Sequence, residues 1–158
     1  MLVDDKGYRL NVGIILTNAQ CKLFWGQRVQ LDAWQFPQGG LLNSETPMDG
    51  MYRELYEETG LHKDDVEVIA ESSNWYSYEL PKQFIRNHQT PVVIGQKQKW
   101  FLLRLLSSDD QINLTRSEKP EFANWTWVDY WSPIDEVIYF KQEVYKAALN
   151  EFAANLEI

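Results

Sequence analysis

The stretch from Gly39 to Leu61 reads GGLLNSETPMDGMYRELYEETGL, and it decides the fold of this chain. A helix is predicted from Pro47 to Thr59, because Thr46 can cap its first turn and proline suits the first helical position. Gly60 follows directly, and glycine is the residue that most readily ends a helix. Each boundary of this helix therefore has a signal of its own.

Three glutamates of the predicted helix, Glu54, Glu57 and Glu58, are spaced i, i+3 and i+4 and share one face. Like charges at these spacings destabilise a helix by about 0.2–0.5 kcal/mol per pair. An arbitrary acidic face is most often a solvated surface. Clustered glutamates with too few counter-charges also suit a hard divalent cation such as Mg²⁺, which prefers carboxylate oxygens.

The spacing extends upstream of the helix. The pattern is Gly39, five residues, Glu45, seven residues, Arg53-Glu54-Leu55, one residue, Glu57-Glu58, one residue and Gly60-Leu61. A chance match of all these positions in one chain is on the order of 10⁻⁷. The stretch resembles the Nudix box of the Nudix hydrolases. This resemblance implies an α/β Nudix fold with a mixed sheet between helices (α/β/α), and a metal-dependent enzyme that cleaves a nucleoside diphosphate linked to another group.

The resemblance also implies roles for individual residues. The metal-binding positions are Gly39, Gly40, Glu54, Glu57 and Glu58. Glu45 and Arg53 match supporting positions, and Arg53 is interpreted as holding a carboxylate in a fixed geometry, which lysine could not do equally well. Mg²⁺, or Mn²⁺ in its place, would stabilise charge on phosphate oxygens and lower the pKa of an attacking water, whose proton one glutamate accepts. The spacing does not say which glutamate is that base.

Stretches outside the box extend the resemblance over nearly the whole chain. They are Gly7-Tyr8-Arg9 to Asn11-Val12-Gly13, WQFPQGG at 34–40, GQKQKWFLL at 95–103, PEF at 120–122 and NWTWVDYW at 124–131. These stretches are similar to the bacterial RNA pyrophosphohydrolases, a Nudix subfamily whose members convert the 5′-triphosphate or diphosphate end of RNA to a monophosphate and so promote mRNA decay. A dinucleoside polyphosphate hydrolase and an RNA-end-binding module with a decayed catalytic site remain alternatives. The intact set of three helix glutamates argues against decay.

Further site residues follow from the same resemblance. Glu121 matches a position for an additional metal ligand or base. The candidate substrate-binding residues are Arg9, Arg28, Tyr78, Gln96, Lys97, Lys99, Phe140 and Lys141. Arg28 and Phe140 can sandwich a base while Lys141 donates to its edge. Phe140 can equally begin the apolar stripe of the last helix, and Lys97 and Lys99, which share one face of a predicted strand, can equally be ordinary edge lysines.

The rest of the chain predicts strands around one helix and a closing helix, which favours a mixed α/β layer fold. Strands are expected at 12–16 and 22–28, which form a hairpin, and at 66–70, 100–106 and 125–128. The closing helix is expected to begin near Val137 or Phe140 and to end near Leu156. No repeat or long linker divides the chain, so residues 1–158 are expected to form a single domain.

Composition limits the possible partners. The net charge of −8 excludes a broad basic surface for nucleic acid, but a cleft can still bind one RNA end or a nucleotide. No apolar run approaches the roughly 20 residues that span a bilayer, so no membrane partner and a cytoplasmic location are expected. The single cysteine cannot form an internal disulfide. An activating protein partner would have no signature in this sequence.

Overall fold

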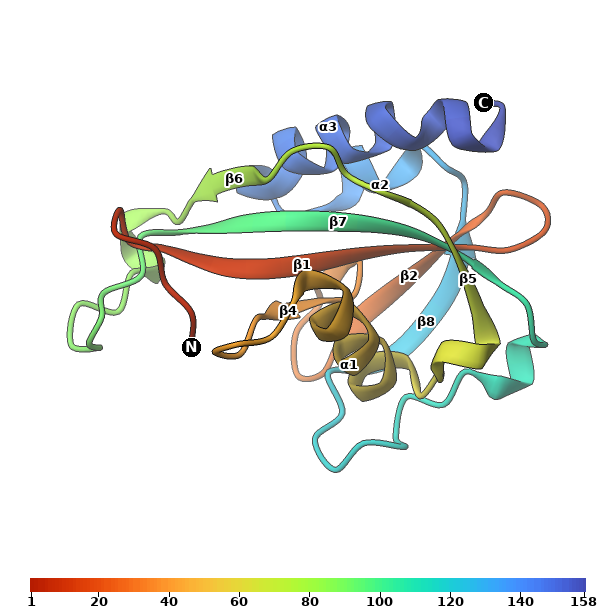
Figure 1. Ribbon diagram of the computed structural model, residues 1–158, viewed down its shortest axis with the longest axis horizontal. Coiled ribbons are helices and arrows are strands. Elements are labelled where there is room, and N and C mark those ends of the chain that lie inside the picture. Colours follow the sequence, from red (N-terminus) through yellow and green to blue (C-terminus); the bar gives the residue numbers. More distant parts are fainter.

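A mixed eight-stranded β-sheet forms the centre of the computed structural model, which describes residues 1–158 (Figure 1). The strands are β1 (Tyr8–Thr17), β2 (Leu23–Arg28), β3 (Trp34–Gln35), β4 (Gln38–Gly40), β5 (Val66–Glu71), β6 (Tyr76–Glu79), β7 (Gly95–Leu105) and β8 (Phe122–Val128). Their order is β3-β2-β1-β7-β5, and β4 pairs with β1, β6 with β7 and β8 with β2.

Three α-helices and five short 3₁₀ turns complete the chain. The helices are α1 (Pro47–Thr59), α2 (Ser132–Glu136) and α3 (Gln142–Phe152). The turns are η1 (Lys63–Asp65), η2 (Lys82–Phe84), η3 (Asp109–Gln111), η4 (Tyr139–Lys141) and η5 (Ala153–Leu156). None of the helices has the length and apolar character needed to cross a membrane.

Helices α1 and α3 lie on opposite sides of the long central strands β1 and β7 (Figure 1). Because successive strand residues face opposite sides of a sheet, these strands contribute to two separate cores. Ile15 and Trp100 pack with Tyr145 and its neighbours in α3, whereas Ile14 and Phe101 pack with residues of α1. The predicted α/β/α arrangement is confirmed.

The predicted bounds of α1 are also confirmed. Thr46 caps the helix by accepting a hydrogen bond from the Asp49 backbone N–H at 3.1 Å, and Pro47 is its first residue. Gly60 ends it in the left-handed conformation at a φ of 75°.

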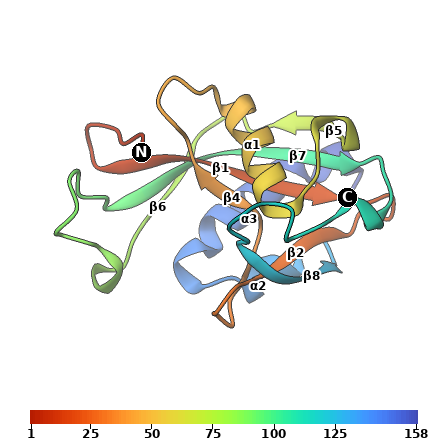
Figure 2. The same ribbon diagram turned by 90° about the horizontal axis from the view of Figure 1, so that it is seen from below.

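Strand pairing differs in part from the predicted hairpin. β1 and β2 do pair antiparallel, but they are paired only next to the turn that joins them, where Thr17 lies opposite Leu23. Beyond it, β1 is flanked by β4 and the parallel strand β7, whereas β2 pairs with β3 and β8. Figure 2 shows β2 and β8 side by side, away from β7. The sheet therefore opens between the two strands and leaves room for β4 beside β1.

Tyr145 connects α3 to the segment between β3 and β4. Its fully buried hydroxyl accepts a hydrogen bond from the Phe36 backbone N–H at 3.1 Å. We expect Tyr145→Phe to destabilise the protein by about 1–3 kcal/mol in urea unfolding, because it leaves a buried N–H without a partner. Tyr139→Phe is the matched control and should change stability by less than about 0.5 kcal/mol, since Tyr139 is 63% exposed. Equal stability of the two variants would contradict this assignment.

Candidate active site

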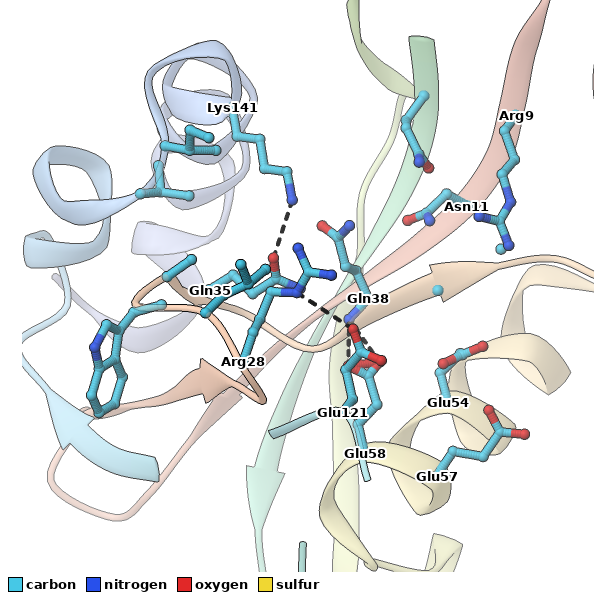
Figure 3. Close-up of a pocket in the computed structure, with 18 of the residues that line it drawn as sticks. Arg9, Asn11, Arg28, Gln35, Gln38, Glu54, Glu57, Glu58, Glu121 and Lys141 are labelled. Carbon is cyan, nitrogen blue, oxygen red and sulfur yellow. Dashed lines mark hydrogen bonds and ion pairs between the residues drawn. The ribbon is translucent and has the colours of Figure 1, made fainter. Parts of the chain in front are cut away.

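A cleft of about 1550 Å³ runs between the acidic face of α1 and the segment that leads into α3 (Figure 3). β1, β2, β4 and β6 contribute to its walls, together with the loops that connect β6 to β7 and β7 to β8. All of the residues predicted for the site line this cleft, except Glu45, Lys97 and Lys99.

The three glutamates of α1 differ in exposure. Glu54 and Glu58 are buried, with 8% and 3% of their surface exposed, whereas Glu57 reaches solvent. The Glu58 carboxylate accepts the backbone N–H of Gln38, at 3.2 Å to Oε2 and 3.4 Å to Oε1. Figure 3 shows Glu58 pointing from the helix toward Gln38 and Glu121. The acidic face is therefore directed into the cleft.

Arg53 holds this acidic face against the preceding loop. Its Nε and Nη2 donate to the two carboxylate oxygens of Glu45 at 2.8 and 2.9 Å, and its Nη1 donates to Glu54 at 2.7 Å. Nη2 also donates to the carbonyl oxygen of Gly40 at 2.9 Å, and Nη1 reaches Glu57 at 3.4 Å. One planar guanidinium therefore connects α1, the loop before it and the end of β4.

Gly39 allows the Glu54 carboxylate to approach the backbone of β4. A Cβ at this position would lie 2.0 Å from Cδ of Glu54, which is far inside van der Waals contact. Any side chain here would push the carboxylate away from the strand. Gly39 therefore lies directly against one of the predicted metal-binding carboxylates.

Burial and charge repulsion raise the pKa of both inward-facing glutamates. Burial is the main cause for Glu58, whose pKa lies well above its usual value, and the charges of Glu54 and Glu121 raise it further. Burial also raises the pKa of Glu54, although Arg53 opposes this shift. The folded protein thus binds more protons than the unfolded chain just above the usual glutamate pKa, and its stability falls as the pH rises through that range.

The donor set fits a hard divalent cation, because it consists of carboxylate and carbonyl oxygens with few counter-charges. No group of three or more His, Cys, Asp or Glu side chains is arranged so that it could hold a metal ion. Arg53 instead binds Glu54, and the carbonyl of Gly40 accepts from the same guanidinium. The ligand set of Gly39, Gly40, Glu54, Glu57, Glu58 and Glu121 therefore stays a prediction.

Glu121 reaches the cleft from the loop between β7 and β8. This loop is fixed to the end of α1: the Asn113 N–H donates to the Thr59 carbonyl at 2.8 Å, and Arg116 Nη1 donates to the Gly60 carbonyl at 2.8 Å. No basic residue lies in the last turn of α1, so Arg116 supplies a cation at the negative end of the helix dipole. This contact joins residues far apart in the chain, so no local sequence signal predicts it.

Arg28, Phe140 and Lys141 also line the cleft. Figure 3 shows Arg28 between Lys141 and Glu121. Arg28 Nε lies 3.6 Å from the Glu121 carboxylate, and Lys141 donates to Gln35 at 3.2 Å. Burial, together with the charge of Arg28, lowers the pKa of Lys141 to about 8. Phe140 is half-buried and packs against Tyr78, so it serves both the cleft wall and the core.

Polar side chains form the floor of the cleft on β1 and β7. Because these strands are parallel and in register, Arg9 lies beside Gln96, and Asn11 lies beside Gln98. The Gln98 amide donates to Asn11 at 2.8 Å and to Gln38 at 3.2 Å. Arg9 Nε is buried without a hydrogen-bond partner, which leaves it available for a substrate acceptor. Asn11 and Gln38 were not predicted from the sequence as site residues, although Asn11 lies in the quoted Asn11-Val12-Gly13 stretch and Gln38 in WQFPQGG.

Lys97 and Lys99, which were predicted either to bind substrate or to be ordinary edge lysines, lie on the other face of β7 and do not line the cleft. They pair instead with Asp4 and Glu71, both at 3.7 Å. Strand alternation explains the difference, because Gln96 and Gln98 take the cleft-facing positions.

Comparison with known proteins agrees with this geometry. The NUDIX domain family matches residues 7–150 of the chain. This chain belongs to the NUDIX family. Members of this family generally use divalent metal ions. A relative from Francisella philomiragia, named RNA pyrophosphohydrolase, is 56% identical to this NUDIX hydrolase over 151 residues, which cover 96% of this chain and 97% of the relative. A relative of the same name from Hydrogenovibrio crunogenus is 54% identical over 155 residues, covering 98% and 94%.

Solved structures share the NUDIX fold at lower identity. The E. coli dihydroneopterin triphosphate pyrophosphohydrolase superposes with a TM-score of 0.73 at 19% identity, covering 94% of this chain and 98% of that one. A C. elegans Ap4A hydrolase in a binary complex gives a TM-score of 0.68 at 18% identity, with the same coverage.

The Arg53 contacts predict the effect of a charge-conserving change. We expect Arg53→Lys to lower kcat/KM by about 10- to 100-fold, because an ammonium cannot contact Glu45, Glu54 and the Gly40 carbonyl together. Arg104→Lys is the matched control, since Arg104 makes one exposed ion pair, with Glu67 at 3.5 Å. Steady-state kinetics at saturating divalent metal measure both variants. Wild-type activity of Arg53→Lys would reduce Arg53 to a charge-balancing residue.

Proposed function

We propose that this NUDIX hydrolase is an RNA 5′-pyrophosphohydrolase, which converts the triphosphate or diphosphate end of RNA to a 5′-monophosphate. The observation that carries this proposal is the continuity of one cleft, which joins the acidic face of α1 to the Arg28, Phe140 and Lys141 slot. Identities of 54–56% to relatives named RNA pyrophosphohydrolase support it.

The acidic end of the cleft is where we place the reaction. Glu54, Glu57, Glu58 and Glu121, with the backbone at Gly39 and Gly40, would hold Mg²⁺, or Mn²⁺ in its place. When bound, the cation neutralises charge on the phosphate oxygens and makes a bound water more acidic. Arg53 keeps the carboxylates in place, and a carboxylate of this group accepts the proton from the attacking water.

The floor of the cleft suits the phosphate chain. Arg9 brings a guanidinium with a free Nε, and Tyr78 lies beside it with its phenol protonated, since burial raises the pKa of Tyr78 to about 12. Gln96 extends the same polar surface along β7. These groups would donate hydrogen bonds to phosphate oxygens and orient the phosphate chain of the substrate toward the glutamates of α1.

The slot formed by Arg28, Phe140 and Lys141 suits a nucleobase. The Arg28 plane and the Phe140 ring offer stacking surfaces, and Lys141 can donate to an acceptor on the base edge. Arg28 also faces Glu121, so a base in this slot would lie at a fixed place relative to the reacting phosphates of the RNA. Because the pKa of Lys141 is about 8, its charged donor is lost as the pH rises above that value.

The setting of the reaction follows from its substrate. We propose that residues 1–158 act as one catalytic domain, since both cores share the strands β1 and β7. An RNA 5′ end is a cytoplasmic substrate, so we place the protein in the cytoplasm, where removal of the 5′-pyrophosphate would promote mRNA decay.

A product assay on end-labelled 5′-triphosphate RNA tests this function. We expect 5′-monophosphate RNA to appear with Mg²⁺ and not with EDTA, and cleavage to exceed that of diadenosine tetraphosphate. Glu58→Gln should lower turnover by more than about 100-fold, which is beyond the loss typical for residues that only hold metal ligands in place. Glu136→Gln, an exposed carboxylate of the same cleft, should stay near wild type. Faster cleavage of diadenosine tetraphosphate than of the RNA would favour a dinucleoside polyphosphate hydrolase. No cleavage of either substrate would indicate a binding module.

A further inference from the structure

The segment from Leu80 to Ile94, which connects β6 to β7, has an unusual charge pattern. It contains Lys82 and Arg86 but no aspartate or glutamate, although the whole chain has 23 of these acids against 15 lysines and arginines. Both cations are exposed, and neither forms an ion pair with an acid. This is a local basic surface on an acidic protein.

The same segment forms one wall of the cleft. Phe84, Arg86 and Gln89 all line it, and Figures 1 and 2 show this part of the chain at one end of the molecule, with the loop between β7 and β8 toward the other. The wall is therefore distinct from the one that carries Glu121.

Phe84 extends the aromatic surface of the base slot. Its ring centroid lies 5.7 Å from that of Phe140, with an angle of 44° between the planes. Phe84 nevertheless remains 48% exposed, although aromatic side chains of this size usually bury most of their surface. A ring that packs on one side and is open on the other offers a platform for a second planar group.

The volume of the cleft exceeds what one nucleotide end requires. It measures about 1550 Å³, whereas pockets for single drug-sized ligands typically measure about 300–1000 Å³. The cleft wall includes the aromatic ring of Phe84 and the unpaired cation of Arg86. Aromatic rings with interleaved cations bind single-stranded nucleic acid, through base stacking and contacts to the phosphodiester backbone.

With the second base of the RNA in the slot of Arg28 and Phe140, we propose that Phe84 and Arg86 form a subsite for the third nucleotide. The base stacks on the open side of Phe84, and its phosphodiester pairs with Arg86, which forms no ion pair with an acid of this protein. This subsite rests on the proposed function, because it extends the same RNA beyond the reacting end.

Substrates of different length test the subsite. The probes are a 5′-triphosphorylated dinucleotide and a hexanucleotide that begins with the same two bases. We expect Phe84→Ala and Arg86→Ala each to lower kcat/KM on the hexanucleotide by about 10-fold, in line with one lost stacking or phosphate contact. Both variants should cleave the dinucleotide within about 2-fold of wild type, because the dinucleotide does not reach the subsite.

Further variants separate binding from structural damage. Phe84→Leu keeps apolar packing against Phe140 but removes the stacking plane, so it should show the same length-dependent loss. Lys146→Ala removes an exposed cation of α3 outside the cleft and should leave both substrates unaffected. 2-Aminopurine at the third position should be quenched on binding to wild type and not to Phe84→Leu.

The outcomes distinguish the subsite from the function on which it rests. If wild type cleaves neither RNA, the proposed function and the subsite both fail. If wild type cleaves both, the subsite alone is overturned by losses that are equal on the two substrates, or by no loss on the hexanucleotide.

Discussion

The guanidinium of Arg53 is the constraint on which the site depends. Glu54 and Glu57 repel each other on one helical face, and Arg53 offsets that repulsion while it binds Glu45 and the Gly40 carbonyl. The acidic face is thereby fixed to the end of β4 rather than left free in solvent. All of these bonds come from one rigid, planar group, so the carboxylates keep their positions together.

The two cores of the fold determine what faces these carboxylates. β1 and β7 place apolar residues toward α1 and α3 along most of their length, but polar side chains where the sheet opens into the cleft. Gln98 binds Asn11 and Gln38 there, so the floor is held by hydrogen bonds rather than by apolar packing. The architecture thus joins an acidic end, a polar floor and an aromatic slot in one continuous cleft.

Local signals predicted the parts of the molecule that depend on neighbours in sequence. Thr46 and Gly60 define α1 by capping, and helical spacing alone places its glutamates on one face. The cleft floor was not predictable in this way, because it depends on the register between β1 and β7, which lie far apart in the chain. Strand alternation showed that Lys97 and Lys99 share a face, but the side on which the cleft lies depends on the whole sheet.

The central claim is that the buried carboxylates of α1, whose pKa values are raised by burial and mutual repulsion, lose their protons and become ligands of a divalent cation. Calorimetric titration with Mg²⁺ in buffers of different ionisation enthalpy measures the protons released on binding, because ligands must be deprotonated. We predict proton release that declines as the pH rises past the raised pKa values of Glu54 and Glu58, and less release in Glu58→Gln than in wild type. Mg²⁺ binding without proton release just above the usual glutamate pKa, or release that is unchanged in Glu58→Gln, would contradict the claim.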